Sequence, residues 1–224
     1  MKLRLSKKSI LKGLEGRLGE DDYLEPLNYL VESFKTESRF NLAGNLAVRH
    51  QLVNRLKVRA QLNDFIKDKD LPTPANPLFV MGLPRSGTTF LFDLLSCDPQ
   101  YRSPAFWEIT RPFPLVNKNT KESKKRIKQT NRELGLARKF IPKLLGMHHI
   151  DAEMPEECSL INTMSVRSFI YMCMANSPGY ENYLKTCDFT ATFVWHKRFL
   201  QALETQSRPE KWLLKDPSHI AHTP

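Results

Sequence analysis

Cysteine is scarce in this sequence of 224 residues, and the four cysteines lie far apart: Cys97, Cys158, Cys173 and Cys187. They form no C-x-x-C pair, which argues against a zinc site and against a small disulfide-bonded scaffold. Histidine and acidic residues gather at residues 148–153, but their spacing matches no ligand pattern of a known metal site. We therefore expect reduced thiols and no bound metal.

Long apolar runs are also lacking. The longest, Phe169 to Ala175, is far too short to cross a bilayer. The start of the chain carries Lys7, Lys8 and Lys12, so it lacks the continuous apolar stretch of a signal peptide. These absences predict a cytoplasmic protein without a membrane span.

Acidic residues are outnumbered by basic ones, 24 against 34, and the formal net charge is +10. A surface of this charge attracts anions, and nucleotides, sulfated ligands, nucleic acid and an acidic membrane all fit it. The length and the ordinary apolar content indicate a globular protein with a full hydrophobic core.

The first long helix is predicted between Asn41 and Lys67. Apolar residues from Leu46 to Ala60 recur there at three-, four- and seven-residue spacings, as in an amphipathic helix. Three prolines between Leu71 and Pro77 end it. We interpret residues 1–76 as a helical N-terminal extension.

A strand, a loop and a helix are predicted next. Leu78 to Met81 is a short apolar run between proline and glycine, which is typical of a strand buried on both faces of a parallel sheet. A glycine-bounded turn follows, and from Thr88 the apolar residues have helical spacing as far as Asp98. An anion-binding loop requires this order of elements.

Basic residues dominate from Asn117 to Lys143. This stretch is interpreted as a solvated helix or mobile insertion, or as a docking surface for an anionic acceptor. It has almost no aromatic residue to stack on a base, so we do not expect a nucleic-acid partner.

Helical structure is predicted to continue to about residue 205. The Pro-Glu-Glu at 155–157 has the composition of a first helical turn, and we expect that helix to run into the 170s. A further helix, with Trp195 and Phe199 on one face, ends before Ser207, and a second buried strand follows at 212–214. Residues 77–224 are thus predicted to be an α/β domain with a basic helical insertion at 117–205.

The loop from Gly82 to Thr89 has part of the Walker A pattern. Its glycines have the G-x-x-x-x-G spacing and Thr89 occupies the hydroxyl position, but the lysine is missing and the loop's cation is Arg85. Glycine lets the backbone wrap an anion closely, and the N–H groups of Ser86 to Thr89 open a helix whose dipole favours negative charge. A phosphate-like anion is the expected guest, and a plain strand-to-helix turn is the alternative.

The run P-R-S-G-T-T at 84–89 resembles the phosphosulfate-binding loop of sulfotransferases that use 3′-phosphoadenosine 5′-phosphosulfate (PAPS), a family related to the tyrosylprotein sulfotransferases. Two further segments are similar, M-P-E-E-C at 154–158 and W-L-L-K-D-P-S-H at 212–219. The resemblance extends from about residue 41 to the end. It implies a P-loop-like parallel sheet flanked by helices, and transfer of a sulfuryl group from PAPS to an acceptor hydroxyl or amine.

The resemblance also implies roles for individual residues. The cofactor-binding residues would be Arg85, Ser86, Gly87, Thr88 and Thr89. Arg85 and Lys215 would stabilise charge on the departing phosphate oxygen, and Glu108 would be the base that takes the acceptor proton.

Other interpretations of these residues stay open. Arg85 and Lys215 can be ordinary surface cations, and Glu108 can simply pair with Arg111. The competing base is His149, which directly follows His148 and which Asp151 would orient.

The segment that grips the 3′-phosphate in the family is not found before Pro224, so we expect a C-terminally truncated chain whose last sheet strands are missing. An inactive fragment or a non-catalytic nucleotide-binding protein is therefore the alternative function. A P-loop kinase fits less well, because only Asp216 resembles a magnesium ligand. The acceptor can be a small molecule, a glycan or a peptide.

Overall fold

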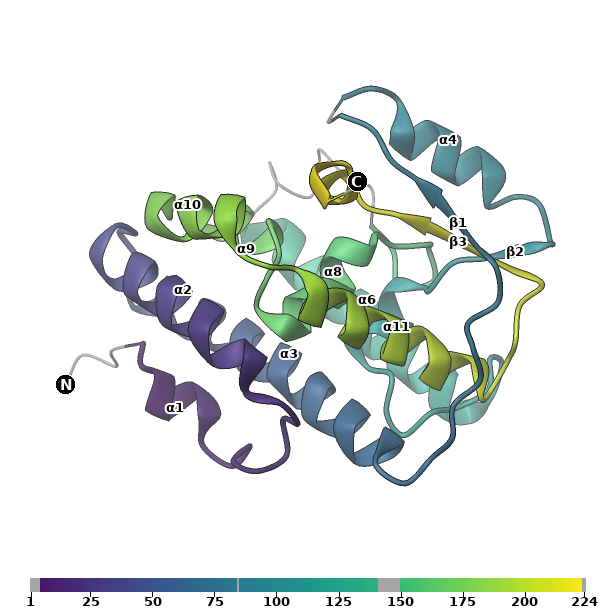
Figure 1. Ribbon diagram of the computed structural model, residues 1–224, viewed down its shortest axis with the longest axis horizontal. Helices are drawn as coiled ribbons and strands as arrows, with labels where there is room; N and C mark the ends of the chain where they lie inside the picture. Colours follow the sequence, from purple (N-terminus) through teal and green to yellow (C-terminus); the bar gives the residue numbers. More distant parts are fainter. Residues whose placement is uncertain (1–4, 84, 141–149, 223–224) are drawn as a thin grey trace. The chain divides into compact units, whose positions relative to one another are not determined.

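The computed structural model describes residues 5–83, 85–140 and 150–222 (Figure 1). The chain forms two compact units, each built from two separate stretches of sequence. Unit 1 comprises Met1–Leu71 and Ser159–Ala202, and unit 2 comprises Pro72–Cys158 and Leu203–Pro224. The predicted extension at 1–76 and insertion at 117–205 stay predictions.

Unit 1 consists of helices and loops in its described residues. The helices are α1 (Lys7–Leu11), η1 (Asp21–Tyr23), α2 (Leu24–Thr36), α3 (Leu42–Ile66), α8 (Cys158–Asn162) apart from its first residue, η2 (Thr163–Ser165), α9 (Ile170–Met174), α10 (Pro178–Thr186) and α11 (Thr190–Glu204) apart from its last two residues. The long helix predicted after Asn41 is confirmed as α3, and Asn41 caps it by accepting a hydrogen bond from the N–H of Gly44 at 2.8 Å.

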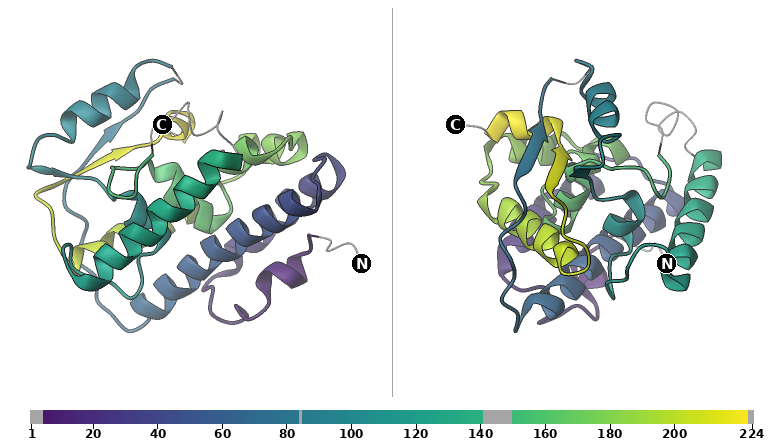
Figure 2. Two further views of the ribbon diagram at one scale, coloured as in Figure 1. Left: turned by 180° about the vertical axis from the view of Figure 1, so that it is seen from behind. Right: turned by 90° about the vertical axis from the view of Figure 1, so that its right-hand side faces the viewer.

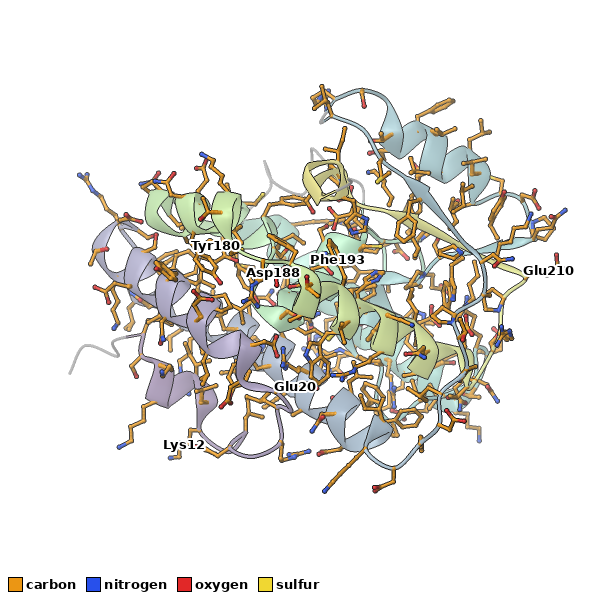
Figure 3. All side chains as sticks on the ribbon, in the orientation of Figure 1. Lys12, Glu20, Tyr180, Asp188, Phe193 and Glu210 are labelled. Carbon is orange, nitrogen blue, oxygen red and sulfur yellow. The ribbon has the colours of Figure 1, made fainter. Side chains whose placement is uncertain are left out.

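The core of unit 1 lies between the apolar faces of its helices. Leu30 of α2 and Leu52 and Leu56 of α3 are fully buried. Tyr180 of α10, labelled in Figure 3, is buried with them, and its hydroxyl donates to the carbonyl of Val166 at 2.7 Å. Since a buried hydroxyl is costly without a partner, this bond favours the observed packing.

A parallel sheet of three strands forms the centre of unit 2: β1 (Pro77–Val80), β2 (Tyr101–Arg102) and β3 (Lys211–Lys215), in the order β1-β3-β2 (Figure 1). Glu210, labelled in Figure 3, precedes β3. Val80 lies beside Lys215, so β1 and β3 end at the same edge of the sheet. Ligands bind at this edge in α/β folds.

Helices accompany the strands of unit 2: α4 (Thr88–Leu95), α5 (Phe106–Thr110), α6 (Lys121–Phe140), the first residue of α8 (Cys158–Asn162), and η3 (Pro217–His222). The predicted α/β fold, a parallel sheet with helices, is confirmed. So are the second buried strand, as β3, and the helix within the basic stretch, as α6. The sequence of β3 contains an apolar run, and the sequence around α6 is rich in basic residues.

The predicted burial of the first strand is wrong. Val80 packs with Phe92 of α4 and Leu213 of β3, but Leu78 is 40% exposed and Phe79 39% exposed. The reason is the position of β1 at the edge of the sheet, where only β3 pairs with it among the described residues.

The helix predicted to begin at Pro155 and to run into the 170s is also wrong. Pro155 forms an isolated bridge with Ala105, and α8 begins three residues later, at Cys158. The N–H of Glu156 donates to the carbonyl of Pro104 at 3.0 Å, so this backbone pairs with another segment. Val166, in a left-handed conformation, separates the next two short helices.

Candidate functional site

The loop that joins β1 to α4 is a tight turn with left-handed backbone at two positions. Arg85 has φ of 69° and Gly87 has φ of 84°, and Gly87 is the N-cap of α4. Ser86 folds back on the turn, since its hydroxyl donates to the carbonyl of Leu83 at 2.6 Å. The N–H groups of the first turn of α4 have no acceptor within the helix, so they are available to an anion.

Gly82 has no side chain, and the side chains of Ser86 and Thr88 pack closely against its backbone. A Cβ atom at this position would lie 2.8 Å from Cγ2 of Thr88 and 2.9 Å from Oγ of Ser86. Any larger residue would push the two hydroxyl residues of the loop out of place. The motif's first glycine is thus needed for close packing, and its second, Gly87, for a positive φ.

Lys215, at the end of β3, reaches the loop. It is only 3% exposed, and its ammonium donates to Oγ1 of Thr89 at 2.8 Å and to Oε1 of Glu157. A buried ammonium needs such partners, because desolvation is otherwise costly. The structure therefore brings two of the predicted site residues, Lys215 and Thr89, together with the carboxylate of Glu157, for which no role was predicted.

Backbone pairing between the start of α5 and the loop before α8 holds the segment next to Glu157 in position. The N–H groups of Phe106 and Trp107 donate to the carbonyls of Met154 and Ala152, at 3.0 and 2.9 Å. The side chain of Glu157 is 18% exposed, so its carboxylate keeps some access to solvent while it contacts Lys215. The site thus offers two cations, Arg85 and Lys215, hydroxyl groups and one partly accessible carboxylate.

Glu108, the predicted base, lies in a different environment. One carboxylate oxygen accepts from Nη2 of Arg102 at 2.8 Å and the other from the N–H of Ala105 at 2.9 Å, at the start of α5. Arg102 is in register with Trp212, three residues before Lys215, or about 10 Å along β3. Glu108 pairs with Arg102, then, and Arg111 pairs with Glu133 instead. The role of Glu108 as the base stays a prediction.

The family model described as "Sulfotransferase family" matches residues 77–224, which is more than half of the chain. The chain belongs to this sulfotransferase family. No curated protein matches the sequence significantly.

Two solved structures of sulfotransferases are similar to this family member. Sulfotransferase STF9 from Mycobacterium avium is 27% identical, with a TM-score of 0.80 over 99% of this chain and 59% of its own. Sulfotransferase STF1 from Mycobacterium tuberculosis H37Rv is 29% identical, with a TM-score of 0.76 over 99% of this chain and 63% of its own. The chain thus spans 59% and 63% of the length of these two relatives.

Asp216 of this family member does not resemble a magnesium ligand in its contacts. The residue is fully buried, and one carboxylate oxygen accepts from the N–H and the hydroxyl of Ser218, at 2.8 and 2.6 Å. These bonds start the turn into η3. Among the described residues, no group of three or more His, Cys, Asp or Glu side chains can hold a metal ion.

Two other titratable groups near Lys215 are neutral at physiological pH. Burial, followed by the negative charge of Asp216, raises the pKa of the Cys158 thiol well above its usual value. Burial lowers the pKa of His219 to about 4, although the Asp216 carboxylate lies 3.7 Å away. Both groups are therefore poor candidates for acid–base chemistry at neutral pH.

Two further predictions concern residues 141–149 and the membrane. His148 and His149, the competing bases, lie outside the described residues. No helix within the described part of the chain is long and apolar enough to cross a membrane.

Proposed function

We propose that this protein transfers a sulfuryl group from PAPS to an acceptor hydroxyl or amine. The observation that carries the proposal is the hydrogen bond from Lys215 to Thr89. Through this bond a buried cation at the end of β3 contacts the proposed anion-binding loop, which follows β1. Membership of the sulfotransferase family supports it. The family match does not itself name the donor, so PAPS is inferred from the loop and the resemblance.

The loop has the shape and chemistry for the sulfate and 5′-phosphate end of the donor. Gly82 and Gly87 keep the backbone close and bent, and the exposed side chains of Arg85, Ser86 and Thr89, with the half-buried Thr88, supply a cation and hydroxyl donors. Bound PAPS would supply a sulfuryl group whose bond to the phosphate oxygen breaks as the acceptor oxygen bonds to sulfur.

Arg85 and Lys215 would stabilise the negative charge that develops on the departing phosphate oxygen. Preorganised cations act strongly there, because little reorganisation is needed when the charge appears. Lys215 is the better preorganised of the two, since it is buried and held by Thr89 and Glu157, whereas Arg85 is exposed. A metal ion is not needed for this stabilisation.

The acceptor must lose a proton as it attacks, and Glu157 is better placed than Glu108 to take it. Glu157 contacts Lys215 and its side chain is 18% exposed, whereas the side chain of Glu108 is 6% exposed and pairs with Arg102, whose register partner Trp212 lies about 10 Å along β3 from Lys215. We therefore propose Glu157 as the base and Glu108 as a residue that holds the start of α5 against Arg102.

Calorimetry on the full chain tests the donor site. We expect 3′-phosphoadenosine 5′-phosphate to bind without a metal, and Arg85→Ala to weaken binding by about tenfold or more, the loss of one charge-assisted contact. Arg39→Ala, a change at another exposed arginine, is the matched control and should bind normally. If ATP binds with Mg²⁺ and 3′-phosphoadenosine 5′-phosphate does not bind, the kinase alternative is favoured.

Incubation with labelled PAPS and a panel of phenols, sterols, glycans and peptides tests the transfer itself. Transfer of label to one class of acceptor would support the proposal and identify the acceptor. Nucleotide binding without transfer to any acceptor would favour the non-catalytic nucleotide-binding alternative.

A further inference from the structure

Helix α6 carries a basic face that the proposed reaction does not use. Ser123, Arg126, Thr130 and Leu134 are its buried positions. The exposed cations on the other side, which we call the α6 basic face, are Lys121, Lys124, Lys125, Lys128, Arg132 and Lys139. The left view of Figure 2 shows α6 as a single straight rod at the front.

The cations of the α6 basic face are nearly aligned. With about 100° between successive residues, Lys121, Lys128, Arg132 and Lys139 fall within about 20° of one line along the helix, and Lys125 lies about 40° from it. This line is opposite the buried positions and extends about 27 Å from Lys121 to Lys139. The result is a row of positive charges rather than a scattered surface.

The two acidic residues of α6 do not neutralise this row. Glu122 pairs with Arg126 at 3.1 Å, and Glu133 pairs with Arg111. Within the part of the chain that the structure describes, no cation of the α6 basic face forms an ion pair with a carboxylate. The positive charge is therefore available to a partner.

We propose that the α6 basic face docks the protein on an anionic lipid bilayer. Clusters of four to eight Lys and Arg residues on a helix suit such a surface, and each cation raises the affinity by about fivefold. The apolar side of α6 packs inward, with Leu134 only 7% exposed, so the helix would adsorb to the headgroups rather than insert.

The composition of the face favours lipid over other anionic partners. Five of its six cations are lysines, which are depleted at protein–protein interfaces and lack the planar bidentate geometry that suits discrete phosphate sites. Residues 121–139 contain no aromatic side chain on which a nucleic-acid base can stack. A bilayer needs neither, because many headgroups contact a row of point charges at once.

Co-sedimentation of the full chain with vesicles tests this proposal without any donor or acceptor, so its outcome is independent of sulfuryl transfer. We expect binding to phosphatidylcholine vesicles that contain roughly one-third phosphatidylserine, and not to pure phosphatidylcholine. Binding should fall steeply between about 0.1 M and about 1 M salt, as the Debye length shortens from about 10 to about 3 Å.

Charge-neutralised variants give the decisive comparison. The triple change Lys125→Gln, Lys128→Gln and Arg132→Gln should lower the vesicle partition coefficient by about 100-fold. The matched control removes three exposed lysines of unit 1, by Lys57→Gln, Lys67→Gln and Lys197→Gln, and should bind normally. The double change Lys125→Arg and Lys128→Arg should also keep binding, which separates charge from folding.

Three outcomes would overturn the proposal. They are equal binding to neutral and anionic vesicles, equal loss of binding in the α6 triple variant and the unit 1 control, and binding to RNA or polyglutamate without binding to the phosphatidylserine vesicles. The last would assign the face to a polymeric anion.

Discussion

The ammonium of Lys215 donates a 2.8 Å hydrogen bond to Oγ1 of Thr89, although the two residues lie 126 positions apart in the chain. The parallel pairing of β1 with β3 makes this contact possible, because both strands end at one edge of the sheet. The contact joins the loop between β1 and α4, the proposed anion-binding loop, to a cation that is fixed by a strand.

Replacement of Lys215 by methionine should remove most of the proposed activity. We expect kcat/KM for sulfuryl transfer to fall by about 100- to 1,000-fold, the usual effect of removing one preorganised group that stabilises transition-state charge. The matched control is Lys211→Met at the exposed start of the same strand, which should leave kcat/KM nearly unchanged. Equal losses in both variants would mean that Lys215 matters only for the strand.

Replacement of Glu157 by glutamine should change the pH profile of the reaction. If Glu157 is the base, the variant loses the rising acidic limb of kcat/KM together with most of its rate. Glu108→Gln should keep the shape of the profile and instead lower the free energy of unfolding by about 2 kcal/mol, because it weakens the buried pair with Arg102. The opposite pattern would restore Glu108 as the base.

Gly82→Ala should abolish donor binding while the protein stays folded. The added methyl group would meet Thr88 and Ser86 at under 3 Å and distort the loop. Calorimetry with 3′-phosphoadenosine 5′-phosphate measures the loss, and circular dichroism checks the fold. Gly135→Ala on α6, where a Cβ atom meets nothing within 4 Å, should bind normally and gain about 0.5 to 1 kcal/mol of stability.

His219 should make the protein less stable in mild acid. Burial holds the pKa of His219 at about 4 in the folded state, against about 6.5 for an exposed histidine, so the unfolded state binds more protons between these pH values. The contribution is complete above about pH 6.5 and is lost as the pH falls toward 4, by about 1 to 3 kcal/mol in total. Denaturant melts at several pH values should show this slope disappear in His219→Gln and persist in His50→Gln, at an exposed histidine.

Local patterns were sufficient to predict the main elements. The apolar spacing from Leu46 to Ala60 predicted α3, and the glycines at 82 and 87 predicted the loop between β1 and α4. β2 was missed because it has two residues, Tyr101 and Arg102, and no apolar run. The start of α8 was misplaced because the backbone around Pro155 pairs with Pro104 and Ala105, which lie 50 residues away.

The contacts within the site could not be predicted in the same way. The sequence indicated Lys215 and the loop as parts of one site, but Glu157 is 58 residues from Lys215, and no spacing connects them. Its place in M-P-E-E-C was the only available signal. The alternative pairing of Glu108 with Arg111 was wrong, because its partner is Arg102, which lies outside any helical spacing.

The positive φ of Arg85 sets a limit on how this loop can evolve. A side chain in left-handed backbone costs about 1 kcal/mol relative to glycine, so Arg85→Gly should make the folded protein more stable while it removes the loop's cation. Selection for stability alone would replace this arginine. Stability selections on random variants of this chain should therefore recover glycine at position 85, at the cost of the proposed anion binding.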